Sequence, residues 1–101
     1  MIILDKVIVV CEAGITTSLL VKKLEDLAKE KGEDYDIQSK SMEEGLDYLK
    51  QNKVDVVLLG PQVHHVADKY IESTDAKVVK ISVSDYNTMN VYSIYEQMSE
   101  L

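Results

Sequence analysis

The sequence predicts an α/β protein, a three-layer α/β/α sandwich in which four helices cover both faces of a four-stranded parallel sheet. Short β-branched runs without polar alternation are typical of strands buried on both faces of such a sheet. A segment with helical periodicity follows each predicted strand, and this alternation implies right-handed crossovers between parallel strands. The chain has 101 residues, 46% of them hydrophobic, so we expect residues 1–101 to form a single domain with one core.

The first strand is predicted at Val7–Val10, and an amphipathic helix follows from Thr17 onward. The apolar positions of this helix repeat at helical spacing: Leu20, Leu24, Leu27 and Ala28. Gly32 stands where a C-terminal cap belongs. Residues 35–40 alternate between apolar and polar side chains, which predicts a short, half-exposed strand at an edge of the sheet.

The second helix is predicted to begin with a capping box, in which Ser41 is the N-cap and Glu44 reaches back to its amide. The stripe that this helix buries consists of Met42, Leu46 and Leu49. Gly45 lies inside the helix and weakens it by about 1 kcal/mol relative to alanine.

The second half of the chain continues the alternation. Residues 54–59 predict a fully buried strand that Gly60 and Pro61 close. The following helix has its apolar residues at helical spacing: Val63, Val66, Ala67, Tyr70 and Ile71. Residues 77–83 predict a strand and residues 84–87 a turn. The face of a terminal helix then consists of Val91, Ile94, Tyr95 and Met98.

We expect the strand order 2-1-3-4. In open parallel sheets, ligands bind outside the carboxyl ends of the strands, at the switch in strand order. The loops expected at that edge are residues 11–18, 60–65 and 84–90, so candidate site residues are sought there.

Composition excludes several classes of function. The formal net charge is −7, and all eleven basic residues are lysines, which speaks against nucleic acid as a partner. The longest apolar run, residues 7–11, is far too short to cross a membrane. The N-terminal residues do not read as a secretory signal, so we expect a cytoplasmic protein whose single cysteine is a free thiol.

That cysteine, Cys11, directly follows the first strand. The amides of the next loop and of the first helical turn have no acceptor within the helix, so they favour an anion there, and the same field favours a thiolate. Gly14 gives the loop conformational freedom, and Thr16, Thr17 and Ser18 add hydroxyl donors. The alternative is a core cysteine followed by ordinary N-cap residues.

Three segments together resemble the lactose/cellobiose-type enzyme IIB of the sugar phosphotransferase system. They are residues 11–21 (CEAGITTSLLV), 55–62 (DVVLLGPQ) and 85–90 (DYNTMN), and the resemblance covers nearly the whole chain. This sequence differs from the usual family pattern at two positions. A small or uncharged residue is more common at the position of Glu12, and many relatives have glycine at the position of Asn87. Asn often replaces glycine where a left-handed conformation is needed.

The resemblance implies a phosphoryl relay. A phosphohistidine on enzyme IIA passes its phosphoryl group to Cys11, which passes it to a sugar that enters through the membrane subunit IIC. The implied phosphate-binding loop consists of Glu12, Ala13, Gly14, Ile15, Thr16, Thr17 and Ser18. The relay needs no cofactor, and it places the protein in the cytoplasm, peripherally associated with IIC.

Three other residues are possible neighbours of the site. Gln62 could donate an amide to the phosphoryl group or simply be a solvated residue at a helix start. His64 could line the mouth of the site, and Tyr86 lies on the third loop. Adjacent helical residues diverge, so His64 and His65 do not form a metal site, and we expect no metal.

Two alternatives to the relay stay open. A low-molecular-weight cysteine phosphatase also has a cysteine between the first strand and the first helix, but it requires an arginine six positions later, where this chain has Thr17. A non-catalytic regulatory domain of the same fold would keep the sheet and lose the thiol chemistry.

Overall fold

The computed structural model describes residues 5–11, 14–33 and 35–99. Within these residues, the strands are β1 (Asp5–Val10), β2 (Tyr35–Lys40), β3 (Val56–Leu59) and β4 (Lys77–Lys80). They form a parallel sheet in the order β2-β1-β3-β4, which confirms the predicted topology. The register places Val9 of β1 between Ser39 of β2 and Leu58 of β3.

The described residues form five α-helices and one 3-10 helix. They are α1 (Gly14–Glu30), α2 (Met42–Gln51), the 3-10 helix η1 (Pro61–Val66), α3 (Ala67–Ser73), α4 (Val83–Thr88) and α5 (Val91–Ser99). The four helices of seven residues or more match the four predicted ones, and α4 is additional. None of these helices is long and apolar enough to cross a membrane.

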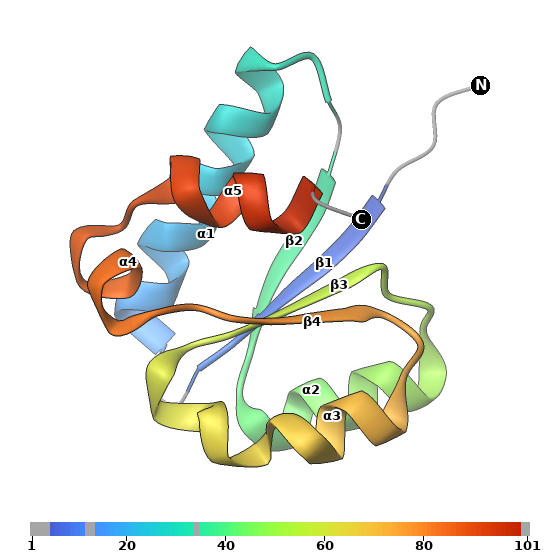
Figure 1. The fold of residues 1–101 in the computed structure, drawn as a ribbon. Helices are drawn as coiled ribbons and strands as arrows, with labels where there is room; N and C mark the ends of the chain where they lie inside the picture. Colours follow the sequence, from blue (N-terminus) through green and yellow to red (C-terminus); the bar gives the residue numbers. More distant parts are fainter. Residues whose placement is uncertain (1–4, 12–13, 34, 100–101) are drawn as a thin grey trace.

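The sheet is covered on both faces, with α1, α4 and α5 on one side and α2 and α3 on the other (Figure 1). The central position of β1 explains why its sequence lacks polar alternation. Val7, Val9 and Cys11 pack into the core under α1, α4 and α5, whereas Ile8 and Val10 pack into the core against η1 and α3. Both sets of side chains are buried, as a central parallel strand requires.

Helix α1 begins three residues before the predicted position, so Gly14 to Thr16 belong to its first turn rather than to a loop. The apolar repeat that predicted this helix begins only at Leu20, and Gly14 and Thr16 are poor helix formers, so the sequence pattern did not reveal the true start. The C-terminal cap is as predicted. Gly32 has φ of +74°, and the Glu33 amide donates to the Ala28 carbonyl at 2.9 Å.

Helix α2 has the predicted capping box. The Glu44 amide donates to the Ser41 hydroxyl at 3.2 Å, and the Ser41 amide donates to the Glu44 carboxylate at 3.0 Å. Hydrogen bonding to the Ser41 backbone and then to its side chain holds the pKa of Glu44 below its ordinary value.

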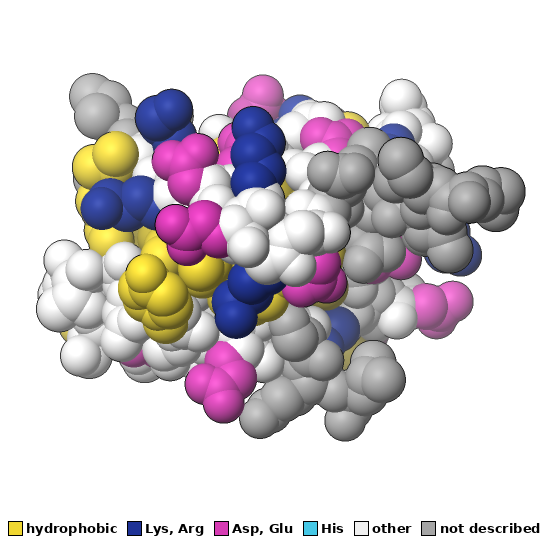
Figure 2. Space-filling model, turned by 90° about the horizontal axis from the view of Figure 1, so that it is seen from above, with side chains coloured by type: hydrophobic (Ala, Val, Ile, Leu, Met, Phe, Trp, Pro, Cys, Tyr) yellow, Lys and Arg dark blue, Asp and Glu magenta, His cyan; other side chains and the backbone are white. Residues whose placement is uncertain are grey.

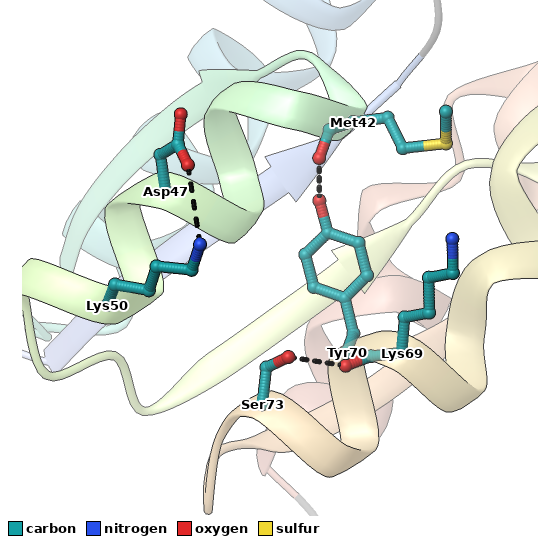
Figure 3. A network of polar contacts seen from close by, with 6 residues as sticks. All are labelled: Met42, Asp47, Lys50, Lys69, Tyr70 and Ser73. Atoms are coloured by element: carbon teal, nitrogen blue, oxygen red, sulfur yellow. Dashed lines mark hydrogen bonds and ion pairs between the residues drawn. The ribbon is translucent and has the colours of Figure 1, made fainter.

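Gly45 has a role beyond weakening α2, and the prediction missed it. Tyr70 reaches from α3 to the start of α2, where its hydroxyl donates to the Met42 carbonyl at 2.6 Å (Figure 3). A Cβ on Gly45 would overlap that hydroxyl and lie 3.1 Å from Cγ2 of Val10. Glycine at this position therefore lets the buried tyrosine join the two helices.

The third predicted helix is in fact η1 followed by α3, with non-helical backbone at Val63. Val63, Val66 and Tyr70 are buried as predicted, but Ile71 is 55% exposed. A 3-10 helix has about three residues per turn, so its tighter winding rotates the following residues relative to a continuous α-helix. Ile71 is thereby turned out of the predicted face.

Residues 77–89 also differ from the prediction. Strand β4 ends at Lys80, and α4 occupies the predicted turn. Ser82 caps α4 by accepting a hydrogen bond from the Asp85 amide at 3.1 Å. The prediction had placed Ser82 inside a strand over residues 77–83 and so missed this N-cap. Asn87 lies inside α4, and the left-handed residue is Met89, with φ of +50° at the end of this helix.

Candidate functional site

The candidate site lies at the carboxyl ends of β1 and β3, where α1, η1 and α4 also meet (Figure 1, left). The predicted loops do share this edge of the sheet. Cys11 follows β1, Gln62 lies in η1 after β3, and Tyr86 lies in α4 after β4. The structure brings these three side chains together, although 75 residues separate the first from the last.

Cys11 continues β1 by one residue. Its amide donates to the Lys40 carbonyl at 3.1 Å, so the backbone bonding of β1 to β2 extends past the end of the strand. The residue is 5% exposed. Its Sγ lies 2.9 Å from the Tyr86 hydroxyl and 3.8 Å from Oε1 of Gln62. The thiol is therefore held in place by backbone on one side and by polar side chains on the other.

Gly60 is a neighbour of the thiol that sequence reasoning treated only as the end of a strand. Its amide donates to the Val10 carbonyl at 2.9 Å, which keeps it beside β1. A Cβ at this position would lie 3.2 Å from Sγ of Cys11, closer than an ordinary contact. Gly60 has φ of −63°, so space at the sulfur, and not a left-handed backbone, is what glycine supplies here.

The start of α1 follows Cys11 closely in the chain. Gly14 to Ser18 are the first five residues of this helix, directly after the segment that follows Cys11. Amides in a first turn lack acceptors within the helix, and the helix dipole adds positive potential there. Glu12 and Ala13 of the predicted phosphate loop lie outside the described residues.

The other predicted neighbours have different surroundings. Nε2 of His64 lies 3.2 Å from the Leu59 carbonyl, so this ring links η1 to the end of β3. Asp85, next to Tyr86, accepts a hydrogen bond from the Ser93 hydroxyl at 2.8 Å and thereby links α4 to α5. Among the residues that the structure describes, no three His, Cys, Asp or Glu side chains are placed to hold a metal ion.

The surface beside the site is partly apolar. Seen from the side of α1 and α5, hydrophobic side chains gather toward α4, with lysines and carboxylates around them (Figure 2). The large exposed hydrophobic residues on α1, α4 and α5 are Leu19, Val83 and Tyr92, which are 47%, 60% and 69% exposed. Tyr92 also lines a groove of about 250 Å³ between α1 and the start of α5. This surface suits a protein partner better than a small molecule.

A larger cavity, of about 390 Å³, lies at the opposite end of the molecule, between the carboxyl ends of α2 and α3. Its lining includes Asn52, Asp55 and Thr74. This cavity is separate from the candidate site, whose thiol lies at the carboxyl end of β1.

The comparisons with known proteins point to one family. A family model described as "PTS system, Lactose/Cellobiose specific IIB subunit" matches residues 6–97. The galactose-specific EIIB component of the phosphotransferase system of Lactococcus lactis subsp. cremoris (strain MG1363) is 39% identical over 92 residues, 84% of this chain and 85% of that protein. The cellobiose-specific EIIB component of Lactococcus lactis subsp. lactis (strain IL1403) is 38% identical over 92 residues, with the same coverage.

A solved structure shares the fold. The lactose-specific IIB component domain from Streptococcus pneumoniae has a TM-score of 0.79 to this chain at 15% sequence identity, and the match covers 95% of this chain and 98% of that one. At this identity the likeness shows the fold alone. It agrees with the sheet order and the helix layers described above.

Proposed function

This chain belongs to the lactose/cellobiose-specific IIB family of the sugar phosphotransferase system, and on that premise we propose that Cys11 is the residue on which this phosphotransferase component carries its phosphoryl group. In the acceptance step, the Cys11 sulfur attacks the phosphorus of a phosphohistidine. The S–P bond forms while the P–N bond breaks, and the thiol proton ends on the departing imidazole.

The observation that carries this proposal is the position of Cys11 between the end of β1 and the start of α1. The first-turn amides of α1 favour the charge of a phosphoryl group on the sulfur. Gly60 supports the proposal because it leaves space beside the sulfur. We further propose that the segment from Glu12 to Ser18 is the phosphate-binding loop.

The partners follow from the same proposal. We infer that enzyme IIA, bearing phosphohistidine, is the donor, and that a sugar presented by the membrane subunit IIC is the acceptor. The protein would then work as a single domain in the cytoplasm, beside IIC. The exposed Leu19, Val83 and Tyr92 support weak, transient docking of IIA through apolar contact, because a net charge of −7 offers few cations for ion pairs.

The test is to incubate the protein with phosphoenolpyruvate, enzyme I, the histidine-containing carrier protein and the cognate IIA, and to measure its intact mass. We expect a gain of one phosphoryl group, located on Cys11 by peptide mapping. Cys11→Ser is the matched control, since a hydroxyl nearly replaces the packing of the thiol, and we expect it to gain none while unfolding at nearly the same temperature. A Cys11→Ser protein that still relays phosphate to sugar would overturn the assignment.

A further inference from the structure

Cys11 and Tyr86 form a buried thiol–hydroxyl pair. The two residues are 5% and 6% exposed, and their sulfur and oxygen atoms lie 2.9 Å apart. Buried polar atoms require partners, and here each group satisfies the other. The family resemblance implies chemistry for Cys11 and for the loop that follows it, so the tyrosine across from the thiol calls for its own explanation.

The position of the Tyr86 hydroxyl is fixed from both ends of a short helix. Ser82 caps the start of α4, and the left-handed Met89 ends it, with its amide directed at the carbonyls of Asp85 and Tyr86. The Tyr86 ring is part of the core that α1 and α5 cover. Because the ring is held by packing, its hydroxyl is aimed at the sulfur before any partner arrives.

Several other ionisable groups that the structure describes on the neighbouring elements have different surroundings. Nε2 of His64 contacts the Leu59 carbonyl, and Nζ of Lys40 lies 4.8 Å from the centre of the Tyr48 ring. The Asp85 carboxylate, on the same helix as Tyr86, accepts from Ser93. On α1, Lys22 and Lys23 are exposed. Of these groups, the Tyr86 hydroxyl is the one that contacts Sγ.

We propose that Tyr86 is a positioning residue for phosphoryl acceptance, whose hydroxyl donates a hydrogen bond to the Cys11 sulfur and so raises the fraction of thiolate at neutral pH. This inference rests on the proposed function of Cys11. The thiol releases its proton when the thiolate forms. When the thiolate attacks, its electron pair forms the S–P bond, the electron pair of the breaking P–N bond passes to the imidazole, and the imidazole takes up a proton in place of the one that the thiol released. The sulfur then loses its negative charge and becomes a poor acceptor, which frees the hydroxyl to donate to a phosphoryl oxygen.

The test is the rate of Cys11 alkylation by iodoacetamide as a function of pH, in Tyr86→Phe and in the unmodified protein. A hydrogen bond to a charged group favours the charged form by about 10-fold to 100-fold, so Tyr86→Phe should raise the midpoint of the profile by about one to two pH units. Well above the midpoint, the variant should react at least as fast, because a thiolate without this hydrogen bond is more basic and more nucleophilic. A general loss of structure would not produce this crossing of the two profiles.

Tyr70→Phe is the matched control. It removes the hydroxyl of another buried tyrosine, on the opposite face of the sheet, where the acceptor is the Met42 carbonyl. We expect its alkylation profile to be that of the unmodified protein. Phosphoryl acceptance from IIA at neutral pH should slow about tenfold or more in Tyr86→Phe and stay unchanged in Tyr70→Phe.

An unshifted alkylation profile in folded Tyr86→Phe would overturn the proposal. If Tyr86→Phe does not fold, 3-fluorotyrosine at position 86 keeps the ring and makes the hydroxyl a stronger donor, so the midpoint should fall, and an unchanged midpoint overturns the proposal. Alkylation requires no partner, which separates this result from the proposed function. An unmodified protein that gains no phosphoryl group would overturn the relay, whereas a phosphorylated protein with no effect of Tyr86→Phe would overturn only the role of Tyr86.

Discussion

Cys11 combines two properties that pull against each other: burial, which favours a neutral thiol, and a place at the start of a helix, which favours a thiolate. Among the described residues, the side chains in hydrogen-bond contact with the sulfur, those of Gln62 and Tyr86, are polar. Tyr86 places a hydroxyl at the sulfur, and Gly60 leaves room beside it. At the residue scale, the space that Gly60 leaves beside the sulfur is therefore as important to the candidate site as the side chains that contact the sulfur.

Gly60→Ala tests the importance of that space. The backbone at Gly60 is extended and accepts alanine, so any effect comes from the added methyl group near Sγ. We expect unfolding in urea to show a loss of about 1–3 kcal/mol from overpacking, together with slower phosphoryl acceptance by mass spectrometry. Because oxygen is smaller than sulfur, the stability cost should shrink when the same change is made in Cys11→Ser. An equal cost in both backgrounds would mean that the methyl group does not meet the sulfur.

At the scale of elements, two sets of hydrogen bonds hold α2 in place, one between residues close in sequence and one between distant residues. The capping box joins Ser41 to Glu44 within four residues, and Tyr70 joins α3 to the first carbonyl of α2 (Figure 3). The exposed ion pair between Asp47 and Lys50, 3.9 Å long, adds little, since such pairs are worth at most about 1 kcal/mol. Packing and capping thus determine where α2 lies.

Gly45→Ala separates helix propensity from packing. Propensity alone predicts that alanine stabilises α2 by about 1 kcal/mol. The methyl group would overlap the Tyr70 hydroxyl, so we expect a net destabilisation of about 1–3 kcal/mol in urea unfolding. Removing the hydroxyl in the double variant Gly45→Ala with Tyr70→Phe should recover part of the loss. A stabilised single variant would contradict the close approach of these two residues.

The capping box makes stability depend on pH. The pKa of Glu44 is lowered in the folded protein, so its carboxylate contributes stability above its ordinary value of 4.5, and this contribution is lost as the pH falls through the lowered pKa. Glu44→Gln should therefore lower the melting temperature at neutral pH and have a much smaller effect in acid. Glu43, on the exposed face of the same turn, is a suitable control. A difference between Glu44→Gln and the parent that persists unchanged in acid would show that the charge is not involved.

At the scale of the whole molecule, patterns that depend on nearby residues were predictable, and contacts between distant elements were not. The unbroken β-branched run of β1 and the alternation in β2 predicted a central and an edge strand, and the sheet has both. The Ser41 capping box is equally local. By contrast, the exposure of Ile71 follows from how η1 winds, and the reasons for Gly45 and Gly60 lie in side chains of other elements. Such contacts exist only once the chain has folded.

The distribution of charge in the whole chain leads to the last prediction, which is that the phosphorylated protein holds its phosphoryl group without hydrolysing it. Hydrolysis requires a positioned water, a general acid or base, and a cation that binds the transition state more tightly than the ground state. The sequence has no arginine, and Lys22 and Lys23 lie more than a turn into α1, with their side chains exposed.

If Cys11 carries the phosphoryl group as proposed, the amides at the start of α1 favour its charge, but they supply little that is specific to the transition state. The isolated phosphorylated form should therefore decay slowly by itself and quickly when membranes with the cognate IIC and sugar are added, as intact mass measured over time would show. Rapid turnover of para-nitrophenyl phosphate by the isolated protein would instead support a cysteine phosphatase, because only an enzyme with its own means of activating water releases phosphate without a sugar acceptor.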